Sequence, residues 1–232
     1  MKKFHSIRNS LSLNYSNYQE FQGLHKEIFQ QHCYYTQLST PTPVILDIGA
    51  HIGLATLYFK QQYPAAQVTA VEPLPQNLKL LQQNLEQNHF YDVTIVPKAV
   101  SAVEGPLTIY FDDSPDHWWS VAGSIRGSWA RTQVSSSLQV ESLSLSQLLT
   151  RPVDLLKLDI EGAETEVLRA AIPYLHQIGE IFVEYHPVEG NYLQELTTLL
   201  KQSGFTIKIY HQGVLHQPPY PRNKLLLIEA RR

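Results

Sequence analysis

The stretch VILDIGAHIG, residues 44–53, decides the fold of this 232-residue chain. A short apolar run, Val44–Ile48, leads into a loop that holds Gly49 and Gly53, and helical periodicity follows over 53–63. This order predicts a buried strand, a tight glycine loop and a helix. The same order also raises a question, since glycines serve either a tight turn or a ligand that leaves no room for side chains.

Strands and helices continue to alternate along the chain. Apolar runs predict further strands at 68–71, 93–96, 154–158, 179–183, 205–210 and 225–228, and helical periodicity predicts helices over 76–87, 163–171 and 193–202. Strands that alternate with helices of roughly 10–15 residues predict an α/β fold with a parallel sheet covered on both faces. The short, turn-rich link before the last strand favours an antiparallel pair there.

Two segments fall outside this alternation. Residues 1–42 are rich in Tyr, Gln, Ser and His, and we expect an N-terminal helical cap with a helix over 20–31. Residues 101–150 are rich in Gly, Pro and Ser, with short strands expected at 107–111 and 137–140. We expect a single α/β domain over 43–232, with residues of about 101–150 inserted over the carboxyl edge of its sheet.

Composition excludes several classes. The formal net charge of −3 gives no basic excess, so nucleic acid is not an expected partner. The single cysteine, Cys33, cannot build a disulfide framework or a cysteine zinc site. An apolar signal region is missing after the N-terminal lysines, and no run approaches the roughly 18 apolar residues of a membrane span. We therefore expect a cytoplasmic protein without a membrane partner.

The glycine loop is the first candidate site, because open α/β sheets bind ligands at the carboxyl ends of their strands. Its spacing is G-x-x-x-G, whereas dinucleotide-binding proteins carry G-x-G-x-x-G, which weighs against NAD. Asp47 precedes the first glycine and suits an ammonium group, and Glu72 ends the second strand and suits ribose hydroxyls. An amino-acid headgroup with a ribose describes S-adenosylmethionine (AdoMet); the alternative is a tight turn with exposed acids.

Four segments, DIGAHIG, VEPLPQN, KAVS and above all LLKLDIEGAE, resemble the FkbM-type methyltransferases, which are class I AdoMet-dependent enzymes. The resemblance covers roughly residues 44–188. It implies a Rossmann-like sheet of seven strands, mostly parallel with the last antiparallel. It also implies methyl transfer, usually to an oxygen of a sugar, polyketide or similar metabolite. We therefore expect a small-molecule or glycan acceptor. The sequence identifies neither the particular acceptor nor the oligomeric state.

The resemblance also assigns cofactor residues. Gly49 and Gly53, with Asp47, match the loop for the methionine end, and Glu72 matches the acid that binds the ribose. Asn77 is a cap or a ribose neighbour, Ala99 flanks the adenine, and Asp159 lies next to the methyl group. His51 is either part of this loop or a residue that faces solvent, and both interpretations stay open.

Methyl transfer is an in-line displacement, and an alcohol acceptor needs a base or a metal ion that lowers its pKa. Asp159 and Glu161 end the fourth strand, and Glu184 and His186 end the fifth. With its ordinary pKa, His186 is the readiest base near neutral pH. The alternative is that these four side chains hold one divalent ion, for which their oxygen ligands suit Mg or Mn; we favour metal-free chemistry.

Other acidic and aromatic residues have simpler interpretations. Glu164 and Glu166 are expected to be surface acids in the first turn of a helix. The adjacent Trp118 and Trp119 either stack on an acceptor or form a small hydrophobic cluster. Two other functions compete with methyl transfer: an NAD-dependent oxidoreductase on a similar sheet, and a non-catalytic module that binds the cofactor.

Overall fold

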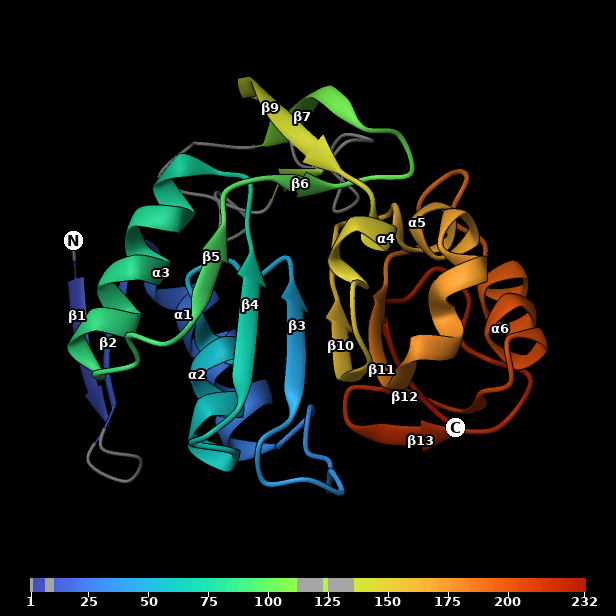
Figure 1. Ribbon diagram of the computed structural model, residues 1–232, viewed down its shortest axis with the longest axis horizontal. Coiled ribbons are helices and arrows are strands. Elements are labelled where there is room, and N and C mark those ends of the chain that lie inside the picture. Colours follow the sequence, from blue (N-terminus) through green and yellow to red (C-terminus); the bar gives the residue numbers. More distant parts are fainter. Residues whose placement is uncertain (1, 7–10, 112–122, 125–135) are drawn as a thin grey trace.

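The structure is a computed structural model that describes residues 2–6, 11–111, 123–124 and 136–232. Its main sheet has the strand order β13-β12-β14-β11-β10-β3-β4-β5 (Figure 1). The bounds of these strands are β3 (Val44–Ile48), β4 (Gln67–Val71), β5 (Thr94–Val96), β10 (Val153–Leu158), β11 (Ile178–Tyr185), β12 (Thr206–His211), β13 (Val214–His216) and β14 (Leu226–Arg231).

The pairing of these strands confirms a mostly parallel sheet. β5, β4, β3, β10 and β11 are parallel neighbours, and β14 is antiparallel to both β11 and β12. The described sheet has eight strands where we expected seven, because β13 forms a short hairpin with β12 inside the link that we expected to be only a turn.

Helices cover both faces of the sheet (Figure 1). On one face lie α1 (Tyr18–His25), α2 (Leu54–Gln62) and α3 (Pro75–Gln87); on the other lie α4 (Leu145–Leu148), α5 (Glu164–Ala170), a 3-10 turn (Ile172–Gln177) and α6 (Leu193–Gln202). Successive β3 residues alternate between two cores: Ile45 packs with α2, whereas Leu46 and Ile48 pack with α5. The apolar run of β3 therefore follows from burial on both faces.

The N-terminal segment contains more than the expected helical cap. β1 (Lys2–Ser6) and β2 (Leu11–Tyr15) form an antiparallel pair, and a π-helical turn (Lys26–Gln30) extends α1. Asn84 of α3 and Asn88, which caps its C-terminus, anchor β2: Asn84 Oδ1 accepts from the Asn14 N–H at 2.6 Å, and Asn88 Oδ1 accepts from the Ser12 N–H at 2.9 Å. The helix expected over 20–31 corresponds to α1 and this π-helical turn, whereas the two strands that precede it were not expected.

A second sheet lies above the carboxyl ends of β3 and β4 (Figure 1). Its strands are β6 (Ala99–Val100), β7 (Gly105–Phe111), β8 (Gly123–Ser124) and β9 (Ser136–Leu143), in the order β6-β9-β7-β8. Trp118 and Trp119 lie outside the described residues. The domain limits remain predictions.

Among the helices that the structure describes, none has the length and apolar character that a membrane crossing requires.

Candidate functional site

A cavity opens at the carboxyl ends of β3, β4, β10 and β11. The N-terminal segment and the β6–β7 region complete its wall. Nine of the residues predicted for the site line it: Gly49, His51, Glu72, Asn77, Ala99, Asp159, Glu161, Glu184 and His186. Asp47 and Gly53 are described but are not on this wall. The structure thus brings all four candidate catalytic residues and most of the candidate cofactor residues to one cavity.

Both loop glycines have a cause within the protein itself. Gly49 has φ +75°, and a Cβ there would lie 1.7 Å from the carbonyl oxygen of Asp159. Gly53 has φ +93°, and its Cβ would lie 2.6 Å from Leu81 Cδ1. Since side chains rarely adopt these φ values, the loop needs glycine at both positions even without a ligand. The close approach at Gly49 joins the end of β3 to the end of β10.

Asp47 lies behind the loop. Its Oδ2 accepts a hydrogen bond from Thr56 Oγ1 at 2.5 Å, and its Oδ1 lies 3.5 Å from Lys157 Nζ. The side chain is fully buried. The expected direct contact between Asp47 and an ammonium group therefore has no support in this arrangement, in which a lysine of the protein already faces the carboxylate.

Glu72 is fixed at the end of β4 by three N–H donors. Its Oε1 accepts from the Leu74 N–H (3.0 Å) and from Asn77 Nδ2 (3.1 Å), while Oε2 accepts from the His51 N–H (2.9 Å). Burial raises the pKa of Glu72 to about 7, although these hydrogen bonds oppose the shift. Asn77 is therefore a direct neighbour of Glu72, and its assignment as a cap or a ribose neighbour stays a prediction.

His51 lies on the cavity wall in the left-handed region, with φ 51°. Its Nε2 is 3.7 Å from Glu20 Oε1, and its side chain is 21% exposed. Burial lowers the pKa of His51 to about 4, so the ring is neutral at pH 7. Of the two open interpretations, this placement supports the loop residue rather than the side chain that faces bulk solvent.

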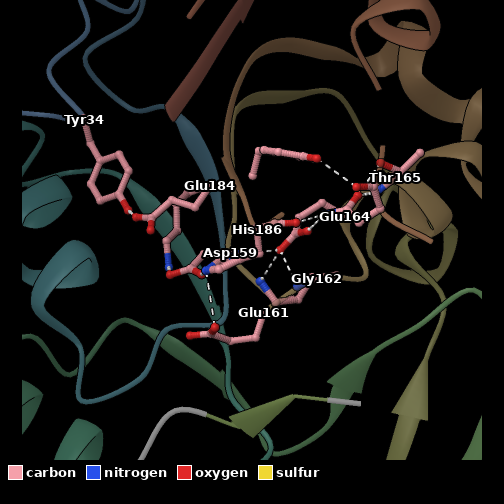
Figure 2. Close-up of polar contacts among 12 residues, drawn as sticks. Tyr34, Asp159, Glu161, Gly162, Glu164, Thr165, Glu184 and His186 are labelled. Atoms are coloured by element: carbon pink, nitrogen blue, oxygen red, sulfur yellow. Dashed lines mark hydrogen bonds and ion pairs between the residues drawn. The ribbon is translucent and has the colours of Figure 1, made fainter. Parts of the chain in front are cut away.

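An acid–histidine cluster lies across the cavity, made of Asp159, Glu161, Glu164 and His186 (Figure 2). His186 Nδ1 is 2.9 Å from Glu164 Oε1, and Nε2 is 3.3 Å from Glu161 Oε2 and 3.9 Å from Asp159 Oδ1. Burial alone would lower the pKa of His186, but Glu161, Glu164 and Asp159 outweigh it and raise this pKa well above its ordinary value. His186 is therefore an imidazolium at neutral pH.

Glu164 is not the surface acid that we expected. Its side chain is fully buried, and it accepts hydrogen bonds from the Gly162 N–H (2.9 Å) and from Asn191 Nδ2 (2.6 Å) in addition to its contact with His186. It does lie in the first turn of α5, as expected. His186 and Asn191, which lie 22 and 27 positions further along the chain, contact its carboxylate. The position of Glu164 in the helix gives no sign of these contacts.

Glu184 faces the same cavity from the end of β11. The hydroxyl of Tyr34 donates a hydrogen bond to its Oε1, and Figure 2 shows the ring of Tyr34 directed at this carboxylate. Burial, with a smaller effect of the Glu27 charge, raises the pKa of Glu184 to about 7, although His186 opposes the shift. A carboxylate with a pKa near 7 can take up a proton at physiological pH.

Sequence reasoning missed several site residues. Glu20, Glu27 and Tyr34 come from the N-terminal segment and line the cavity. Burial, with the charge of Glu161, raises the pKa of Glu20 to about 8. A signal was available for the two acids, because a spacing of seven residues places Glu20 and Glu27 on one helix face. Lys157, buried within β10, was also missed.

Three side chains have a geometry that a metal ion could use. Asp159, Glu184 and His186 each offer one ligand atom, and these atoms lie within 4.8 Å of one another. The set has the oxygen and imidazole ligands that divalent ions accept.

Comparison with known proteins gives a consistent picture. Residues 47–207 match the model of a family described as "Methyltransferase FkbM domain". The chain is 32% identical over 216 residues to methyltransferase sdnD of Sordaria araneosa, covering 81% of this chain and 83% of the relative. It is 26% identical over 230 residues to the 31-O-demethyl-FK506 methyltransferase FkbM of Streptomyces tacrolimicus, covering 87% and 88%.

A solved structure supports the fold. The crystal structure of methyltransferase FkbM from Methylobacillus flagellatus KT superposes with a TM-score of 0.52 at 17% identity. The superposition covers 82% of this chain and 44% of that chain. At this identity the likeness bears on the Rossmann-like architecture alone.

Proposed function

The chain belongs to the FkbM family of AdoMet-dependent methyltransferases, and from this we propose that it methylates a hydroxyl oxygen of a small molecule, sugar or glycan. One observation supports the proposal above the others. A single cavity is lined both by the residues that suit the cofactor, such as Glu72 and the Gly49 loop, and by acidic side chains that suit proton transfer, such as Glu184.

The cavity fits the parts of AdoMet. Glu72 Oε2 accepts one hydrogen bond among the described residues, so it keeps lone-pair capacity for a ribose hydroxyl. Apolar side chains on the same wall, Val71, Leu74, Val100 and Ile109, suit an adenine ring. The methionine end then follows the loop of Gly49 toward Asp159. Asp47 lies behind this loop and contributes its negative charge without direct contact.

When bound, AdoMet supplies a methyl group activated by its sulfonium. The protein must then orient the acceptor in line and accept its hydroxyl proton as the new carbon–oxygen bond forms and the carbon–sulfur bond breaks. Glu184 suits the proton better than His186, because the pKa of Glu184 is about 7 whereas His186 is already protonated. In this assignment His186 holds Asp159 and Glu161 in place as their counter-charge.

The charge of the cavity bears on the class of acceptor. Its described wall carries six acidic side chains (Glu20, Glu27, Glu72, Asp159, Glu161 and Glu184) and three cationic ones (Lys98, Lys157 and His186). Three of the acids have pKa values of about 7 or 8, so the wall has no excess of positive charge for a polyanion such as nucleic acid. A neutral, hydroxyl-bearing molecule needs no such excess, and one relative is named for methyl transfer to an oxygen.

Metal-free chemistry is part of the proposal. Lys157 Nζ lies 3.2 Å from Asp159 Oδ2, and the imidazolium of His186 lies near Asp159 and Glu161, so cations of the protein already partner these acids. We therefore expect turnover to persist after dialysis against EDTA. Loss of turnover that Mg or Mn restores would instead assign the three ligand atoms of Asp159, Glu184 and His186 to a metal ion.

Two measurements test the proposed function. Calorimetric titration should show micromolar binding of S-adenosylhomocysteine and none of NAD; the reverse would establish an oxidoreductase. Methyl transfer from labelled AdoMet should then be measured on hydroxylated small molecules and glycans, with RNA as the comparison. Tight cofactor binding without turnover on any acceptor would favour a non-catalytic module, and turnover on RNA alone would refute the acceptor class.

A further inference from the structure

Lys157 is a buried cation between the cofactor side and the acceptor side of the cavity. It lies in β10, paired in register with Asp47 of β3, and only 3% of its surface is exposed. Its Nζ donates to the carbonyl oxygen of Gly49 at 2.7 Å and lies 3.2 Å from Asp159 Oδ2 and 3.5 Å from Asp47 Oδ1. One ammonium group thus contacts the glycine loop and two carboxylates.

This lysine stays charged. Burial would lower the pKa of Lys157, but Asp159 and Asp47 outweigh burial and raise it above its ordinary value. The positive charge is therefore permanent at physiological pH. It offsets part of the negative charge of the two carboxylates next to the loop.

The two forms of the cofactor differ in charge. AdoMet carries a positive sulfonium, whereas S-adenosylhomocysteine has a neutral thioether. Each additional negative charge near the sulfur strengthens the binding of AdoMet relative to that of its product, and each positive charge weakens it. Since Lys157 contacts both the Gly49 loop and Asp159, its charge acts where this difference arises.

We propose that Lys157 is a positioning residue that sets the ratio of the affinities for AdoMet and S-adenosylhomocysteine, through Asp159, Asp47 and the Gly49 carbonyl. The inference rests on the proposed function, because it needs AdoMet as the cofactor. With Lys157 present, the site prefers the cationic AdoMet over the neutral product less strongly than the two carboxylates alone would make it.

The test compares the dissociation constants of both ligands at pH 8 for the whole chain and three variants. In Lys157→Met, we expect the preference for AdoMet over S-adenosylhomocysteine to rise by about tenfold, the scale of one charge removed from a partly screened site. Lys157→Arg keeps the charge and should keep the preference near that of the unaltered protein. A merely structural role would weaken both ligands by the same factor, and that outcome would overturn the inference.

Lys60→Met is the matched control. Lys60 is equally buried, and its Nζ contacts the Pro64 carbonyl, the Ala66 carbonyl and Asp92 at 2.7–3.0 Å, but it does not line the cavity. This variant should lose stability and leave the preference between the ligands unchanged. An equal change in Lys60→Met and Lys157→Met would also overturn the inference.

A second pair of variants keeps the test decisive if Lys157→Met does not fold. Lys157→Met combined with Asp159→Asn removes one charge of each sign, and Asp159→Asn alone removes only the negative one. The double variant should prefer AdoMet more strongly than Asp159→Asn does, and equal preferences would contradict the role of Lys157. Failure of the unaltered protein to bind either ligand would refute the proposed function instead, so the two failures are distinguishable.

Discussion

Replacing Glu164 with glutamine should uncouple His186 from the helix that holds it. The carboxylate of Glu164 is fully buried and accepts from the Gly162 N–H, from Asn191 Nδ2 and from His186 Nδ1. An amide keeps the shape but has one acceptor oxygen and no charge. Breaking a buried charge pair costs about 3–5 kcal/mol. We expect the lower end, about 3 kcal/mol, because glutamine retains one acceptor.

Urea denaturation between pH 6 and pH 9 measures this loss in the free energy of unfolding. In a separate thermal unfolding experiment, the melting temperature should fall by roughly 6–12 °C, at about 2–4 °C for each kcal/mol in a chain of this size. The pKa of His186 is raised in the folded protein, so its contribution to stability is complete below its unfolded pKa of about 6.5 and is lost as pH rises through the folded value. The stability difference between the two proteins should therefore be largest near pH 6 and shrink toward pH 9.

The matched control is Glu166→Gln, which removes an acid two residues away in the same first turn of α5. It should cost less than about 1 kcal/mol, the scale for an acid that retains access to water. If Glu164→Gln were no more costly than this control, or if its cost did not depend on pH, the coupling between Glu164 and the imidazolium would be wrong.

Four further predictions concern the cavity. Glu184→Gln should lower turnover by about 100-fold or more while S-adenosylhomocysteine still binds, and full turnover in this variant would remove Glu184 as the base. Tyr34→Phe should move the acidic limb of the pH–rate profile upward from about pH 7, because a hydrogen-bond donor to the ionised carboxylate of Glu184 is lost. Glu72→Ala should weaken AdoMet binding by about 1–3 kcal/mol in a calorimetric titration, and unchanged affinity would place the ribose elsewhere. Gly49→Ala should lower the free energy of unfolding by at least about 3 kcal/mol in a denaturant titration, because its Cβ would meet the Asp159 carbonyl. The control Gly105→Ala should lower it by only about 1–2 kcal/mol through backbone strain, since no atom of the described residues, apart from its chain neighbours, lies within 4 Å of its Cβ. Equal losses would contradict this account of the loop.

Elements with a clear apolar pattern could be predicted from the sequence. Strand Val44–Ile48 and helix Leu193–Gln202 have the expected bounds, because a continuous apolar run and a strong helical period each identify one structure. The carboxyl ends of parallel strands share one edge of a sheet, so the meeting of Asp159 with Glu184 followed from strand order alone.

Features that depend on distant contacts could not be predicted. Strand Leu11–Tyr15 is held by side-chain amides about 70 residues away. Its alternating sequence LSLNY fits a strand, but nothing in it identifies these distant partners. Lys157 lies in an apolar strand, where a lysine usually extends toward water. Its alternation with Asp159 was visible, but its position opposite Asp47 depends on the register between β3 and β10.

The place of β14 in the main sheet constrains how the chain can fold during synthesis. β12 touches the rest of the sheet only through β14, yet the ribosome makes β12 first. Until residues 226–231 emerge, β11 presents an open edge, and the hairpin of β12 and β13 has no strand that connects it to the rest of the sheet. The parallel strands β5, β4, β3, β10 and β11 can pair before β14 is made, whereas the β12–β13 hairpin joins the sheet only with residues 226–231, and the open edge of β11 is exposed to wrong pairing in this interval.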